Sequence, residues 1–225
     1  MITYLTRAAA AAMLALASLT VAAPAHAVGA APVDLLTLPD AVAVLPVVEE
    51  SQNDTYDRAR FKHWNKGLNP TDGCNTRNEV LIAEAVEAPA VGANCALTGG
   101  VWWSYYDETE VTSASGLDID HMVPLKEAWG SGAWEWTAER REAYANDQGA
   151  AVSLIAVTAR SNRAKADKDP AQWMPPASSA RCRYAAEWTA TKLRWNLSVD
   201  QAEADTLQAL AAECPGAIVE FEPAE

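Results

Sequence analysis

The spacing of apolar and polar residues predicts a mixed α+β domain that is rich in helices and has a small sheet. Residues 151–159 (AVSLIAVTA) form a short apolar run, which predicts a buried strand. Residues 99–111 and 115–123 mix aromatic and β-branched residues with turn-forming residues, which predicts a small set of antiparallel strands.

Helical spacing and helix-start signals account for most of the remaining chain. Thr76 and Glu79 match the capping box that opens a helix, and Asp169-Pro170 combines a capping acid with a proline suited to a first helical position. The expected helices are residues 53–64, residues 77–86, two pieces within residues 124–147, a helix beginning at Asp169, residues 181–195 and residues 198–214.

The first 27 residues have the order of a secretory signal: one positive charge at Arg7, a short apolar run, and then Ala25-His26-Ala27. A membrane anchor is the competing interpretation, but the run is short and alanine-rich, and no second long apolar stretch follows. We expect cleavage after Ala27 and an extracellular protein that is not attached to a membrane.

The rest of the chain divides by composition into two parts. Residues 28–50 are rich in Ala, Val and Pro and poor in helix or turn signals, so a linker or pro-segment is expected. Residues 51–225 have the size of one domain with a sizeable core.

Four cysteines, Cys74, Cys95, Cys182 and Cys214, form an even set in an exported chain and therefore indicate two disulfides with three possible pairings. Closeness in sequence favours Cys74–Cys95 and Cys182–Cys214. A zinc site is the alternative, but the chain has no C-x-x-C pair.

Charge limits the functions that fit this chain. It has 17 Lys and Arg against 30 Asp and Glu, a formal net charge of −13. Phosphate contacts need cations, so a strongly acidic protein is not a typical nucleic-acid binder. Any such function would need a locally basic face and a metal ion.

Chemistry-bearing residues gather in two stretches. The first, GLDIDHMVPL at residues 116–125, ends a predicted strand on Asp120-His121, with Pro124 three residues later. The second, residues 154–173, is an apolar strand followed by a polar loop with Asn162 and several cations, and then by a helix start. Carboxylate and amide oxygens suit a hard divalent cation, and a neutral imidazole can deprotonate water.

These stretches resemble a known family. DIDHMVP followed by VTARSNRAKADKDP is similar to the HNH, or ββα-metal, nucleases, in the style of the HNH module of RNA-guided CRISPR nucleases and the C-terminal domain of GmrSD-type restriction enzymes. Across roughly residues 54–215, the chain is also similar to exported bacterial proteins of the HNH endonuclease family. The resemblance implies a ββα-metal core (HNH, or His-Me finger) with additional helices.

The resemblance also implies residue roles. His121 would be the general base, and Asp120 and Asn162 would be the ligands of Mg²⁺ or Mn²⁺. The middle asparagine of the HNH motif has no clear match; its place is near Ser153, so the group that orients the imidazole is left open. The insertion between His121 and Asn162 is longer than in minimal modules and is expected to enlarge the rim of the site without altering its centre.

Further residues are candidates for phosphate contacts or for packing. Arg163, Lys165 and Lys168 form a cationic group expected to grip the flanking phosphates, and Arg77 is a further candidate. His63 is interpreted as a packing or surface residue. The aromatic group Trp102, Trp103, Tyr105 and Tyr106 is interpreted as core rather than as a base-stacking surface.

The sequence therefore predicts a secreted, metal-dependent endonuclease that hydrolyses phosphodiester bonds of DNA, with RNA as an alternative substrate. Low sequence specificity is expected because no base-reading helix or zinc finger is evident. A histidine base predicts that activity falls below a pH near 6.5, its ordinary pKa. The rival hypothesis is a catalytically inactive extracellular ββα module that only binds. A different hydrolase is disfavoured by the lack of G-x-S-x-G and H-E-x-x-H motifs. An inhibitor protein cannot be identified from the sequence.

Overall fold

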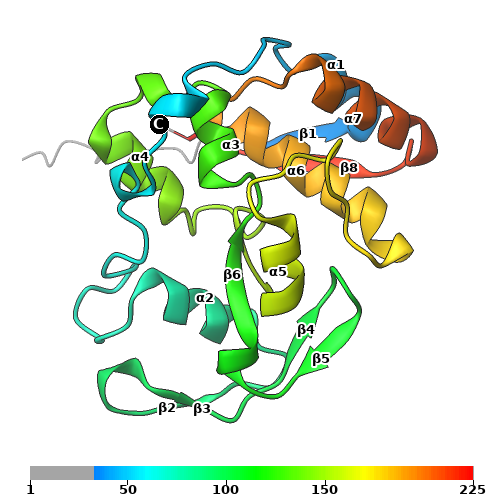
Figure 1. Cartoon of the computed structure of the whole chain (residues 1–225). Coiled ribbons are helices and arrows are strands. Elements are labelled where there is room, and N and C mark those ends of the chain that lie inside the picture. Colours follow the sequence, from blue (N-terminus) through cyan, green and yellow to red (C-terminus); the bar gives the residue numbers. More distant parts are fainter. Residues whose placement is uncertain (1–32, 225) are drawn as a thin grey trace, which may run out of the picture. The chain divides into compact units, whose positions relative to one another are not determined.

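Two antiparallel strands and the helix that follows them hold the residues singled out above. The computed structural model describes residues 33–224, so the expected signal, residues 1–27, lies outside the described residues. The three elements are β6 (Leu117–His121), β7 (Leu154–Thr158) and α5 (Ala159–Lys165). In the β6–β7 pair, Leu117 lies opposite Thr158 and His121 lies opposite Leu154. All five residues of β7 are buried, as the apolar run predicts. Figure 1 shows α5 running beside β6, and α5 contacts both strands.

The helix after β7 begins ten residues earlier than expected. Thr158 caps α5 by accepting from the Ser161 N–H, so Asn162 lies on a helix and not in a loop. Asp169 caps only a single turn, in which its Oδ1 accepts from the N–H groups of Ala171 and Gln172. The expected helix from Asp169 is therefore wrong, because the capping acid closes a turn that does not continue.

One face of the β6–β7 pair packs on a small core. The surrounding elements are α2 (Thr76–Ala83), the β2–β3 pair (Ala90–Val91 and Leu97–Thr98) and the β4–β5 pair (Trp102–Ser104 and Thr109–Val111). Trp102, Leu117 and Ile119 are buried there. The start of α2 is confirmed to within a residue, but its cap is Asn75, and Glu79 instead accepts from the backbone of Leu68 and Asn69.

A larger core begins at the residues that follow the C-terminal end of β6, Met122 and Val123. The expected helical pieces between the two strands are α3 (Leu125–Gly130) and α4 (Ala138–Ala145), and the late helices are α6 (Arg181–Trp195) and α7 (Gln201–Glu213). Tyr184, Trp188 and Trp195 of α6 are all buried in this core. The long helix α6 has the boundaries that its periodicity predicts. Among residues 33–224, the strands form four two-stranded sheets, so the mixed α and β composition with small sheets is confirmed.

The segment expected to be a linker or pro-segment, residues 28–50, is part of this core from residue 34 onward. β1 (Asp34–Thr37) pairs antiparallel with β8 (Ile218–Phe221), and α1 (Leu38–Ala43) packs on α6 and α7. Leu38 and Ala41 are fully buried. The apolar composition of residues 34–43 is therefore that of a paired strand and a buried helix.

Residues 53–64 do not form the expected helix. They contain two short 3-10 turns, η1 (Asn53–Thr55) and η2 (Arg58–Arg60), and Asp57 caps the second turn by accepting from the Ala59 N–H. Phe61 is nevertheless buried. The remaining 3-10 turns are η3 (Ala93–Cys95), η4 (Ala114–Gly116), η5 (Ala133–Glu135) and η6 (Ser178–Ala180).

Both disulfides that sequence proximity favours are present. Cys74 is bonded to Cys95, and Cys182 is bonded to Cys214, which joins the ends of α6 and α7. Each closes a loop of a size that contributes about 3 kcal/mol to stability in the chain-entropy model. None of the helices within residues 33–224 has the length and apolar character needed to span a bilayer.

Candidate active site

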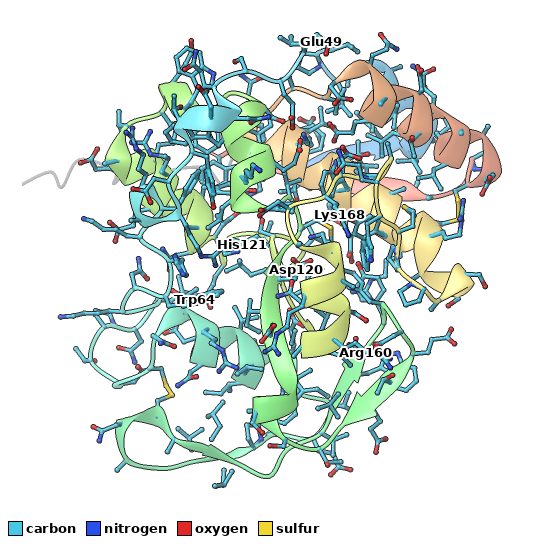
Figure 2. All side chains as sticks on the ribbon, viewed as in Figure 1. Glu49, Trp64, Asp120, His121, Arg160 and Lys168 are labelled. Atoms are coloured by element: carbon cyan, nitrogen blue, oxygen red, sulfur yellow. A yellow bond between two sulfur atoms is a disulfide. The ribbon has the colours of Figure 1, made fainter. Side chains whose placement is uncertain are left out.

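The end of β6 opens onto a cavity of about 330 Å³. The three candidate catalytic residues from the sequence lie in its wall: Asp120, His121 and Asn162. Figure 2 shows Asp120 and His121 beside each other at the end of β6. The rest of the wall is formed by Arg58, Ile119, Pro124, Leu125, Arg163, Ala166 and Asp167. The β6–α5 packing therefore brings two separate stretches of sequence to one cavity.

The imidazole of His121 is oriented by a main-chain carbonyl. Its Nε2 lies 2.9 Å from the carbonyl oxygen of Ala145, at the end of α4. A carbonyl oxygen can only accept, so Nε2 donates, and the neutral ring keeps Nδ1 as its basic nitrogen. Burial lowers the pKa of His121 to about 3. The ring is therefore neutral at physiological pH, with Nδ1 unprotonated.

The insertion between β6 and β7 reaches the centre of the site, which corrects the expectation that it only enlarges the rim. Ala145, whose carbonyl holds His121, belongs to this insertion. Ser153, near the position where the orienting group was left open, donates from its Oγ to Asp147 at 2.6 Å instead. A backbone acceptor thus holds the ring.

Aromatic rings pack against the imidazole. The rings of Trp64 and Tyr144 lie nearly parallel to it, with centroids at 5.4 Å and 6.4 Å, and the ring of His63 lies 6.5 Å away. Trp64 has φ +60°, a left-handed conformation that is uncommon for a bulky residue and costs about 1–3 kcal/mol. Strain of this kind concentrates at functional sites. His63, interpreted from the sequence as a packing or surface residue, packs near the ring of His121.

Asp120 is held by two donors that bond the same oxygen. Oδ2 accepts from the Lys165 ammonium at 2.5 Å and from the Tyr106 hydroxyl at 2.6 Å. Burial raises the pKa of Asp120, and the adjacent Lys165 charge opposes that shift. Within residues 33–224 these two donors leave Oδ1 as the oxygen that Asp120 can offer to the cavity.

Asn162 is placed from α5 on the opposite side of the site. Its Nδ2 donates to Asp118 Oδ2 at 3.3 Å, and the same carboxylate accepts from Arg163 Nε. This contact turns the amide nitrogen toward Asp118, so the amide oxygen is the atom that Asn162 can offer as a ligand. Asp118 therefore supports Asn162.

A hard divalent cation would find oxygen donors here, a carboxylate from Asp120 and an amide from Asn162. Across the described residues, no group of three or more His, Cys, Asp or Glu side chains gathers in a way that could hold a metal ion. The donor set fits a cation that takes few protein ligands and keeps places for water and phosphate, as Mg²⁺ does.

The expected phosphate-binding residues fall into two groups. Arg163 lines the cavity with a side chain that is 74% exposed, and Lys168 lines the adjoining cavity of about 320 Å³. Both positions suit a substrate contact. Arg58 was missed from the sequence because it lies far from the motif, on η2, yet it forms part of the same wall as His121.

Lys165 and Arg77 lie elsewhere than expected. The Lys165 side chain is fully buried, and its three donors are used by Asp120 and by the carbonyls of His121 and Met122. Arg77 donates to the carbonyls of Ala114 and Leu117 at the start of β6. The phosphate-binding role expected for Lys165 is therefore corrected, because no ammonium hydrogen is left for a phosphate. The guanidinium of Arg77 bonds the backbone at the start of β6.

The aromatic run between β4 and β5 is core, as interpreted, with one exception. Trp102, Tyr105 and Tyr106 are buried, whereas Trp103 is half exposed. Tyr106 also has a role at the site that the sequence did not reveal, because its hydroxyl bonds Asp120. That contact depends on the packing of β4 against β7, which no local pattern encodes.

Comparison with known families bears on this site directly. The family model described as GmrSD restriction endonucleases, C-terminal domain, matches residues 94–210, slightly more than half of the 225-residue chain. The chain belongs to the GmrSD C-terminal domain family. The matched range contains β6, β7 and α5, whereas η2 and Trp64 precede it. Membership of the GmrSD family indicates a nuclease-like domain.

A second comparison extends over more of the chain. A protein of Arthroderma benhamiae named "Uncharacterized secreted protein" is 41% identical over 170 residues, which cover 76% of this chain and 81% of that protein. No solved structure matches this member of the GmrSD family.

Proposed function

We propose that this chain is a secreted, metal-dependent endonuclease with a ββα-metal (HNH) core that hydrolyses phosphodiester bonds, in DNA first and in RNA as an alternative. The observation that carries the proposal is the pairing of a buried, neutral imidazole with an Asp120 carboxylate in one cavity. Membership of the GmrSD family supports the same class of reaction.

His121 performs the proton transfer. With Nε2 donating to Ala145, Nδ1 takes a proton from a water molecule, and the resulting hydroxide attacks the phosphorus of the phosphodiester. The bond from phosphorus to the leaving oxygen then breaks, and the leaving oxygen takes a proton from solvent, which gives one phosphate end and one hydroxyl end. The packed rings of Trp64 and Tyr144 keep the imidazole from rotating during this transfer.

Asp120 and Asn162 are the residues that would hold a divalent cation, Mg²⁺ or Mn²⁺. When bound, such a cation supplies positive charge that stabilises the phosphate and the leaving oxygen. Tyr106 and Lys165 keep the carboxylate of Asp120 in place, and Asp118 does the same for the amide of Asn162.

Nucleic acid is bound by local cations in spite of the net charge of −13. Arg58 and Arg163 contribute from two elements to the wall of the cavity, and Lys126 and Lys168 line the adjoining cavity. Backbone phosphates carry no sequence information, so contacts of this kind support cleavage with little sequence specificity.

The test is digestion of plasmid DNA and of RNA by the purified protein, with a metal series and an EDTA control. His121→Ala is expected to abolish cleavage, a loss of at least about 10²-fold for a general base, while circular dichroism shows an unchanged fold. Arg181→Ala, an exposed cation that pairs with Glu213 at 3.4 Å, is the control and retains activity.

Cleavage by His121→Ala at the wild-type rate would exclude His121 as the base. Failure of the wild-type protein to cleave any nucleic acid with Mg²⁺, Mn²⁺ or Ca²⁺ would instead favour the rival hypothesis, a catalytically inactive extracellular binding module.

A further inference from the structure

The buried Lys165 ammonium is placed against the candidate metal ligand. Its Nζ lies 2.5 Å from Asp120 Oδ2 and 2.8 Å from each of the carbonyl oxygens of His121 and Met122. Neither a carbonyl oxygen nor a carboxylate can donate, so three acceptors need three N–H groups, and only the charged ammonium has them. Lys165 is therefore a cation beside Asp120.

The charges around the cavity cancel in pairs. Lys165 neutralises Asp120, and Arg163 lies 3.3 Å from Asp118. Of the two remaining charged residues in the wall, Arg58 is positive and Asp167 is negative. A divalent cation that enters the protein without substrate therefore meets donor oxygens but no net negative charge. A substrate phosphate would add the missing negative charge.

We propose that Lys165 is a positioning and charge-balancing residue that keeps the metal affinity of the free protein low, so that the cation is retained together with a substrate phosphate. This inference rests on the proposed function, because it assigns the metal to Asp120. Lys165 acts through Asp120: with Tyr106 it bonds Oδ2, so that Oδ1 is the oxygen left for a cation. It also ties the backbone of His121 and Met122 to the end of α5.

The test measures Mn²⁺ binding to the full-length mature protein without nucleic acid, by electron paramagnetic resonance. Lys165→Met removes the neighbouring positive charge, so the affinity for Mn²⁺ is expected to rise by on the order of tenfold. The cleavage rate of the same variant is expected to fall, because Asp120 and the backbone after it lose three hydrogen bonds. If Lys165 only stabilised the fold, Lys165→Met would be expected to lower the affinity for Mn²⁺ as well as the cleavage rate.

Two variants separate charge from packing. Lys192→Met removes another fully buried ammonium, which bonds Glu127 and Glu203; it is expected to lower stability and leave Mn²⁺ affinity unchanged. Tyr106→Phe removes the other donor to Asp120 Oδ2 without changing the charge, so it is not expected to raise the affinity tenfold.

A second measurement does not depend on the folding of Lys165→Met. In His121→Ala protein, which keeps Asp120 and Lys165, Mn²⁺ affinity is compared with and without a DNA oligonucleotide. The oligonucleotide is expected to tighten Mn²⁺ binding by on the order of tenfold, because its phosphate supplies the negative charge that Lys165 cancels.

The proposal is overturned if folded Lys165→Met binds Mn²⁺ no more tightly than wild type, or if the oligonucleotide leaves the affinity unchanged. Failure of the proposed function has a different signature: the wild-type protein then cleaves neither DNA nor RNA with any metal. A wild type that cleaves, combined with unchanged affinity in Lys165→Met, rejects the role of Lys165 alone.

Discussion

His121 is the residue whose protonation decides whether the cavity can act as a base. Burial lowers its pKa to about 3, since a protonated ring would be a poorly solvated charge packed against Trp64 and Tyr144. The histidine of an unfolded chain protonates near pH 6.5. Because the folded ring resists protonation, this residue contributes stability that is present above pH 6.5 and is lost as the pH falls toward 3.

Nuclear magnetic resonance of the metal-free protein can follow this titration. The imidazole signal of His121, assigned by its absence in His121→Ala, is expected to show no protonation between pH 8 and about pH 4. The acid loss of activity near pH 6.5 that the sequence predicts is therefore not expected from this group. A midpoint near 6.5 would show that water reaches the ring.

The sequence predicts three residues that the structure brings to one cavity, but it does not reveal the residues that hold them. Asp120, His121 and Asn162 were found because a strand that ends on Asp-His is a motif with a chemical reason, and all three line one cavity. The sequence predicts that Lys165 contacts phosphate. Its burial follows from its ion pair with Asp120, which lies 45 residues earlier in the chain and is not visible in the local pattern. Nothing near the motif points to Arg58, which arrives from a separate segment.

Among the elements, α2 is followed by a partly buried acid at its C-cap. Glu84 follows α2, and its Oε2 accepts from the Ala156 N–H of β7 at 2.8 Å. Burial raises the pKa of Glu84 to about 7, with the Ala156 hydrogen bond opposing the shift. The folded state therefore holds a proton that the unfolded chain releases near pH 4.5, so this residue makes the protein less stable as the pH rises from about 4.5 to 7.

Glu84→Gln keeps an acceptor for Ala156 and removes the charge. At pH 8 it is expected to raise the free energy of unfolding by about 1–3 kcal/mol, and at pH 4 the difference should vanish. Urea unfolding at both pH values measures this, with Glu49→Gln, an exposed glutamate, as the control. Equal stabilisation at both pH values would show that packing, and not charge, is responsible.

Element prediction succeeded where an element carries its own signal. The helix α6 is long, and its buried aromatic residues repeat with helical spacing, so its bounds were predicted. The helix α5 has the polar sequence ARSNRAK and forms against β6 and β7, which a local pattern cannot reveal. Residues 53–64 have aromatic spacing similar to a helix, but the Asp57 side chain closes a 3-10 turn instead.

At the scale of the whole molecule, the protein has a net charge of −13, although Arg58 and Arg163 line the cavity. At about 0.01 M ionic strength the screening length is about 30 Å, so nucleic acid is repelled by the whole protein. At about 0.15 M it is about 8 Å, so the distant carboxylates are screened, whereas direct contacts of Arg58 and Arg163 with a phosphate are weakened less.

This difference in screening predicts that kcat/KM on DNA rises between these two ionic strengths, at constant Mg²⁺. Arg58→Ala is expected to lower kcat/KM at both ionic strengths, since it removes a phosphate contact from the cavity wall. Arg181→Ala is expected to leave kcat/KM unchanged at either ionic strength. A steady fall in wild-type kcat/KM with added salt, as in a basic nuclease, would contradict this account.

The hydrogen bond from His121 to Ala145 has a consequence for how the domain can be rebuilt. The acceptor is a main-chain atom, so a constraint on the side chain at residue 145 would come from the packing of the fully buried Ala145 and not from this hydrogen bond. A change in the length of the segment between β6 and β7, in contrast, would displace the Ala145 carbonyl from the imidazole. Trimming residues 126–153 to a short hairpin would leave Asp120, His121 and Asn162 in place but would remove the Ala145 carbonyl that orients the imidazole.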